Sequence, residues 1–144
     1  MTPTPDKPVL TTVQTDRAAL AQRLHHGGML VVALCAAWCG TCREFASIFT
    51  RLAVAFPAST FVWLDIEDDH ALAGDIDVDN FPTLVVFRDG QPVHFGVSTP
   101  HESVIARLLQ ALSESRRVIA VDDEVAQLPA LLARHAGQSG ALVE

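Results

Sequence analysis

The sequence has little positive charge and no long apolar segment, and each shortage excludes a class of partner. Its 144 residues include 17 acidic and 10 basic side chains, which give a formal net charge of −7. Such a chain offers no basic face to the phosphates of nucleic acid or anionic lipid. The longest uncharged apolar run, at residues 29–39, has about half the roughly 20 residues that cross a bilayer. We therefore expect neither a nucleic-acid partner nor a membrane partner.

Cysteines are also few, and all of them lie close together. Cys35, Cys39 and Cys42 fall in one short stretch, so they cannot join distant parts of the fold. This usage favours a reducing compartment and a local thiol chemistry. The first residues, MTPTPDKPVL, lack the charged-then-apolar pattern of a secretory signal. We therefore expect a cytoplasmic protein.

The succession of apolar patterns predicts one α/β domain at residues 9–115, between an arm at residues 1–8 and an extension at residues 116–144. The arm is rich in proline and is expected to be mobile. Along the domain, the predicted order is strand, helix, strand, helix, strand, short helix, strand, strand, helix. That order predicts a three-layer α/β/α sandwich, with a central mixed sheet that ends in an antiparallel hairpin.

Local patterns place several of these elements. Residues 29–36 are apolar throughout, which is typical of a central strand covered on both faces. Asp89-Gly90 stands between two strand-like runs and predicts a tight hairpin turn. Asp16 is expected to cap a helix that ends near His26, and Thr99, followed by a proline, is expected to cap the last helix of the domain.

The sequence of the extension predicts one short helix at residues 129–137. Leu128, Leu131 and Leu132 would give it a small apolar stripe. We expect this stripe to pack on the domain rather than to face a partner, and we expect residues 138–144 to be mobile.

The C-x-x-C pair Cys39 and Cys42 lies between a predicted strand and a predicted helix. The unpaired N–H groups and the dipole at a helix start stabilise a thiolate, which is the nucleophile of disulfide exchange. Cys39 would then attack, and Cys42, about one turn away, would resolve the mixed disulfide. Zinc sites share this spacing, but structural zinc normally takes four protein ligands. The sequence has no second C-x-x-C and no H-x₃₋₅-H, so a redox pair is favoured over a metal site.

Two separate motifs resemble the thioredoxin family. The run from Trp38 to Arg43 (WCGTCR) resembles its active site, and Phe81-Pro82-Thr83 resembles its cis-proline loop. The resemblance extends over about residues 9–115. It implies a thiol–disulfide oxidoreductase without a cofactor, which acts on protein disulfides and is served by an upstream reductase or dithiol donor. It further implies that Cys39 is the nucleophile and Cys42 the resolving thiol. The implied substrate-binding residues are Trp38, Gly40, Thr41, Phe81 and the cis-proline Pro82.

The sequence departs from the family's proton-transfer pair. A gapless match places Ala33 where the family has a buried aspartate and Trp63 where it has a lysine. Deprotonation of the resolving cysteine must then rely on water or on another group. Glu44, Asp65 and Glu67 are candidate substitutes, although each is also a typical solvated or capping carboxylate.

Two other positions bear on function. Thr41 replaces the usual proline inside the pair and leaves the direction of exchange open, while the absent signal sequence favours a reductant. Cys35 is expected to be a small buried apolar residue, with a regulatory role as the lesser alternative. The competing function is that of a non-catalytic chaperone or assembly module, which would bind a protein through the same fold and the leucines of the extension.

Overall fold

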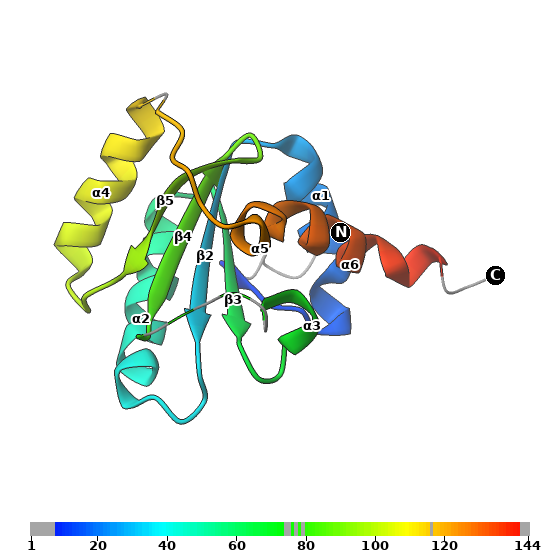
Figure 1. Ribbon diagram of the computed structural model, residues 1–144, viewed down its shortest axis with the longest axis horizontal. Coiled ribbons are helices and arrows are strands. Elements are labelled where there is room, and N and C mark those ends of the chain that lie inside the picture. Colours follow the sequence, from blue (N-terminus) through cyan, green and yellow to red (C-terminus); the bar gives the residue numbers. More distant parts are fainter. Residues whose placement is uncertain (1–7, 74–75, 77, 79, 116, 142–144) are drawn as a thin grey trace, which may run out of the picture.

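The computed structural model describes residues 8–73, 76, 78, 80–115 and 117–141. Its centre is a five-stranded sheet of order β1-β3-β2-β4-β5. Figure 1 labels strands β3, β2, β4 and β5 in that order across the sheet. The strands are β1 Val9–Leu10, β2 Met29–Cys35, β3 Thr60–Asp65, β4 Thr83–Arg88 and β5 Gln91–Val97. β1, β3 and β2 are parallel, whereas β4 and β5 pair antiparallel. The predicted mixed sheet is confirmed.

Strand β2 lies in the middle of the sheet, as its apolar sequence predicted. Val32 pairs with Val62 of β3 on one side and with Val85 of β4 on the other. The hairpin from β4 to β5 turns at Asp89 and Gly90, whose φ angles of 50° and 82° are both positive. Two positive φ angles are characteristic of the tight turn that matches the twist of a hairpin.

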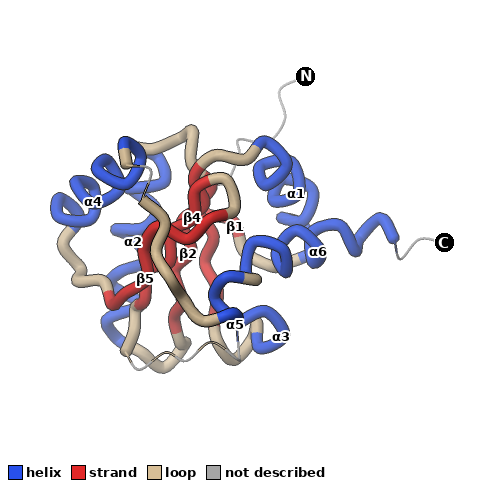
Figure 2. The backbone as a smooth tube through the Cα atoms, turned by 45° about the horizontal axis from the view of Figure 1, so that its top comes forward, coloured by secondary structure: helices blue, strands red, loops and turns tan. Residues whose placement is uncertain are grey.

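Helices cover both faces of the sheet, which confirms the three-layer sandwich (Figure 2). They are α1 Arg17–His26, α2 Gly40–Ala55, α3 His70–Ala73, α4 Glu102–Glu114, α5 Asp123–Ala126 and α6 Leu128–Ala141. A 3-10 turn at Gln14–Asp16 precedes α1. The α2 and α4 helices pack on one face, with Phe45, Phe49 and Leu109 in its core. The α1, α3, α5 and α6 helices pack on the other.

Both predicted helix caps are wrong in detail. Asp16 precedes α1 but makes no side-chain capping bond. The 3-10 turn places its backbone in a helical conformation, and its carboxylate instead accepts hydrogen bonds of 2.8 and 3.0 Å from Thr11 N and Oγ1. The last helix of the domain starts three residues after Thr99, because the His101 carbonyl accepts the first helical bonds and Glu102 is held by Arg51 at 2.7 Å.

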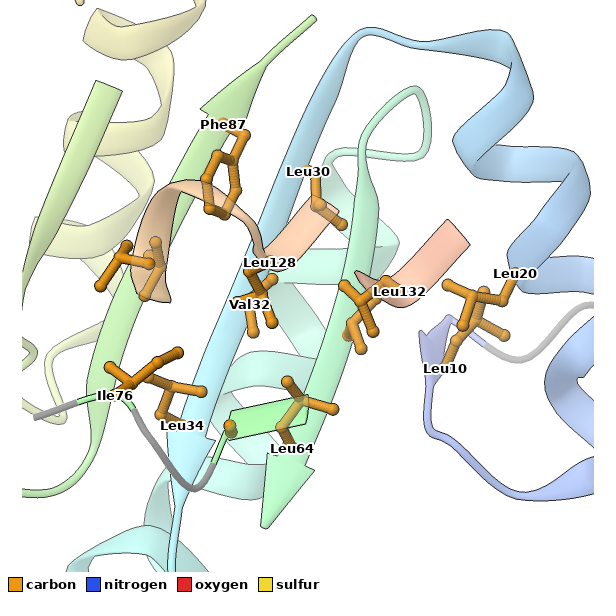
Figure 3. Packing of buried hydrophobic residues seen from close by; sticks show 14 of the residues in the cluster. Leu10, Leu20, Leu30, Val32, Leu34, Leu64, Ile76, Phe87, Leu128 and Leu132 are labelled. Carbon is orange, nitrogen blue, oxygen red and sulfur yellow. The ribbon is translucent and has the colours of Figure 1, made fainter. Parts of the chain in front are cut away.

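The extension packs on the domain and continues the core of one face, as Figure 3 shows. Leu128 and Leu132 of α6 are fully buried over β2 and β3, in the same cluster as Leu20 and Val32. His135 Nε2 also lies 3.0 Å from the carbonyl oxygen of Thr12. Because α3 is only one turn long, it leaves much of this face for α6 to cover.

The helix of the extension is longer than predicted. It runs past Gly137 to Ala141, since burial of Ala136 against the core outweighs the roughly 1 kcal/mol that glycine costs inside a helix. Residues 138–141, which belong to the segment expected to be mobile, are part of this helix. Residues 142–144 and most of the predicted N-terminal arm lie outside the described residues.

Candidate active site

The Cys39 backbone forms the start of α2. It is extended, with φ −89° and ψ 116°, and occupies the capping position. Its N–H donates to the Ala36 carbonyl at 3.0 Å, and its own carbonyl accepts from Arg43 N at 3.3 Å. The chain therefore turns directly from the end of β2 into the helix, which holds Cys39 at the end where the helix dipole favours negative charge.

The two cysteines of the pair differ in exposure. Cys39 is half-buried, whereas Cys42, one turn into α2, has 1% of its surface exposed. Trp38 beside them is 63% exposed, and Gly40 and Thr41 also face solvent. A disulfide on another molecule can therefore approach Cys39 directly but cannot reach Cys42.

The Phe81-Pro82 loop lies at the same edge of the sheet as the cysteine pair. Leu34, near the end of β2, pairs with Thr83 at the start of β4. The peptide bond between Phe81 and Pro82 is cis. The rings of Phe81 and Trp38 meet edge to face, with centroids 5.5 Å apart. Two segments some forty residues apart in sequence thus form one surface.

The three cysteine side chains lie together: Cys35 and Cys42 are buried in one core cluster, and Cys39 packs against it. Burial is the largest influence on Cys42 and raises the pKa of its thiol. Hydrogen bonds from the Cys35 thiol and from the Ala36 backbone N–H lower that pKa, and a hydrogen bond from Cys42 to Cys39 raises it. Burial and the bond to Cys42 raise the pKa of Cys35 far above its usual range. Cys35 is therefore a neutral donor at physiological pH.

No acid replaces the missing aspartate in its own place. Ala33 is fully buried and in register with Trp63, whose ring lies 5.9 Å from that of Phe49 between centroids. The pocket that would hold an aspartate and a lysine is thus filled with aromatic carbon.

The three candidate substitute acids differ in position. Glu44 and Glu67 are exposed. Asp65 is half-buried and in register with Cys35, and its charge raises the pKa of that thiol. The Oδ1 atom of Asp65 accepts hydrogen bonds from the backbone N–H groups of Glu67 and Asp68 at 2.8 and 3.0 Å. Asp65 therefore organises the loop after β3.

Sequence reasoning treated Cys35 as core and missed its contact with Cys42. The signal was available in the period of the strand. Cys35 lies two residues after Ala33 on β2, so both side chains point to the same face of the sheet. That face is the one that α2 covers, and Cys42 projects from the first turn of α2 into it.

Other ligand sites are not evident in the part of the chain that the structure describes. Over those residues, no group of three or more His, Cys, Asp or Glu side chains could hold a metal ion. Within the same residues, none of the helices is long and apolar enough to cross a membrane. Two cavities of about 350 Å³ each open elsewhere, one beside β1 and α1 and the other near the β4–β5 turn, and no cysteine lines either. Both cavities thus lie away from the cysteine pair.

Comparison with known proteins gives a consistent result. The thioredoxin family model matches residues 11–114. A thioredoxin of Staphylococcus aureus is 32% identical over 83 residues, which are 57% of this chain and 80% of that protein. A thioredoxin of Chlamydia muridarum is 30% identical over 82 residues, with the same coverage.

Solved structures show the same fold. A mutant thioredoxin from Halobacterium salinarum superimposes with a TM-score of 0.62 at 25% identity and covers 80% of this chain and 100% of that one. A poplar thioredoxin h gives a TM-score of 0.63 at 21% identity, over 75% of this chain and 98% of that one. The family model ends at residue 114, before the extension.

Proposed function

The chain belongs to the thioredoxin family, and we propose that it exchanges protein disulfides through Cys39, which attacks, and Cys42, which resolves. Family and fold support thiol–disulfide oxidoreductase chemistry in general. The observation that carries the finer proposal is the asymmetry of the pair. Cys39, at the start of α2 and beside the exposed Trp38, is half-buried, whereas Cys42, in the first turn of the helix, is fully buried.

The reaction proceeds in two exchanges. The Cys39 thiolate attacks one sulfur of the substrate disulfide, forms a mixed disulfide, and expels the other sulfur as a thiolate that takes up a proton. The Cys42 thiolate then attacks the Cys39 sulfur and releases the second substrate thiol, which takes the proton that Cys42 lost. Two electrons and two protons pass from the dithiol to the substrate, which is reduced, and a Cys39–Cys42 disulfide remains.

Substrate binding falls to the surface around the pair. Trp38 and Phe81 form its apolar part, and Gly40 and Thr41 present a small, exposed rim. The backbone at Phe81, before the cis-proline Pro82, would pair with an extended segment of the substrate. The proposed ligand of this surface is therefore a chain segment of a protein substrate.

The proposed direction is reduction of substrates in the cytoplasm, with an upstream reductase or dithiol donor to regenerate the pair. The clustering of all cysteines at the site supports a reducing environment. We further propose that residues 9–115 carry the chemistry, whereas residues 116–144 cover the opposite face. No cofactor is needed for the two exchanges.

Reduction of insulin tests the proposal. Wild-type protein with dithiothreitol should precipitate the insulin B chain well above the reagent alone, whereas Cys39→Ser should give only the reagent rate. Ser47→Ala, an exposed change in the same helix, is the matched control and should match wild type. Equal, background-level turbidity from wild type and Cys39→Ser would contradict the proposal.

The competing role as a non-catalytic binding module would use the fold and the leucines of the extension to bind a partner. Of these leucines, Leu128 and Leu132 are fully buried in the core of the protein itself, as expected for a stripe that packs on the domain. A partner could reach them only if α6 left the domain.

A further inference from the structure

Cys35 is a third thiol that neither exchange uses. It is the last residue of β2, and 1% of its surface is exposed, as for Cys42. Both side chains belong to the core cluster beneath α2, together with Phe45 and Leu84. Substrate cannot reach Cys35, so any role it has must act through Cys42.

Cys35 and Cys42 share one buried cluster, and Cys39 packs against it. Interactions with Cys35 and with the Ala36 backbone lower the pKa of Cys42. A Cys42 thiolate can only accept a hydrogen bond, so the Cys35 thiol would be the donor. A donor to a sulfur that must become an anion favours the anion. The titratable groups whose charges act on Cys35 are Cys39, Cys42 and Asp65. All three oppose ionisation of Cys35, so it keeps its proton and stays a donor.

We propose that Cys35 is a positioning residue that stabilises the Cys42 thiolate in the resolving step by hydrogen-bond donation. This inference rests on the exchange function proposed above. Ala33 and Trp63 leave no acid and lysine to assist that step, and Cys35 stands one strand period nearer the pair on the same face. Cys35 takes up no proton and forms no covalent bond. The proton of Cys42 still passes to the departing substrate thiol.

The first test is a titration of the reduced, full-length protein with ¹³Cβ-labelled cysteine, followed by NMR. Cys35→Ala and Cys35→Val both remove the donor, one with less and one with more side-chain volume, so a folded sample of either suffices. In each, Cys42 should titrate at higher pH than in wild type. Cys35→Ser keeps a donor. In this variant the pH at which Cys42 titrates should therefore lie closer to the wild-type value than in Cys35→Ala or Cys35→Val.

The structural control is Val31→Ala, which removes buried volume from the same face of the same strand without touching a thiol. It should leave the titration of Cys42 unchanged. An unchanged titration of Cys42 in Cys35→Ala or Cys35→Val would overturn the proposal. So would a Cys35–Cys42 disulfide in peptide maps of the oxidised wild type, because Cys35 would then act by exchange.

The second test separates the two exchanges with Ellman's reagent, an aromatic disulfide, in stopped flow. Attack by Cys39 releases the first aromatic thiol, and resolution by Cys42 releases the second. Loss of the donor should slow the second phase about three- to tenfold and leave the first unchanged, because one hydrogen bond to a charged group is lost. Equal slowing of both phases would overturn the proposal. A wild type without a second phase would refute the exchange function, whereas the titration result would stand by itself.

Discussion

The two faces of the sheet differ in what their cores are made of. The face under α2 and α4, which we call the catalytic face, buries Cys35 and Cys42 among its aromatic and aliphatic side chains. The face under α1, α3, α5 and α6, which we call the extension face, has an entirely apolar core that Leu128 and Leu132 complete. Changes on the extension face should therefore alter stability alone, whereas changes on the catalytic face should alter chemistry as well.

The largest effect is expected on the extension face. Leu132→Asp places a carboxylate at a fully buried position with no partner for it among the apolar residues of its cluster, so the free energy of unfolding should fall by about 3–5 kcal/mol. Urea denaturation followed by circular dichroism measures this. Ala130→Asp, on the exposed side of the same helix, should change stability by less than about 0.5 kcal/mol. Equal urea midpoints for Leu132→Asp and Ala130→Asp would show that the packing of α6 does not stabilise this face of the sheet.

A second variant restores the missing acid on the catalytic face. Ala33→Asp buries a carboxylate beside Trp63 and Phe49 without a lysine, so it should cost about 3 kcal/mol of unfolding free energy. The exposed Ala37→Asp serves as its control. Full stability of Ala33→Asp in urea would mean that the pocket admits water or a counter-charge, and would remove the reason for assigning stabilisation of Cys42 to Cys35.

A change at the surface of the catalytic face should lower activity and leave stability almost unchanged. Trp38→Ala removes an exposed side chain, so unfolding free energy should change by less than about 0.5 kcal/mol. Loss of the apolar contact should lower kcat/KM for insulin reduction about five- to tenfold. A large stability loss with normal kinetics would mean that Trp38 serves the fold rather than substrate binding.

The smallest effect concerns pH and the outer strand of the catalytic face. Burial lowers the pKa of His94 on β5, which pairs with Val86. Below its unfolded pKa of about 6.5 the unfolded chain binds the proton more readily, so stability falls as pH drops from there towards the folded pKa. Melting temperature should therefore decrease more for wild type than for His94→Gln between pH 7.5 and 5.5. Parallel curves would mean that His94 makes no contribution.

Much of this structure follows from sequence, but particular contacts do not. The period of apolar residues and the Asp89-Gly90 turn are local signals, and they predicted the sheet and its layers correctly. The cap at Asp16 was mispredicted because its carboxylate turns to Thr11, and the length of α6 because a tertiary contact at Ala136 supports a helix through a glycine. The partnership of Cys35 with Cys42 depends on how α2 docks on β2. Strand period indicates the face, but only packing brings the sulfur atoms together.

The most direct test of the proposed chemistry asks which sulfur a substrate joins. Cys42→Ser and Cys39→Ser are each mixed with insulin at pH 7, quenched with acid, and mapped by peptide mass spectrometry. Without its resolving thiol, Cys42→Ser should accumulate a mixed disulfide on Cys39, and Cys39→Ser should accumulate none. The absence of an adduct on Cys42→Ser, or an adduct on Cys35, would contradict the assignment of Cys39 as the attacking residue.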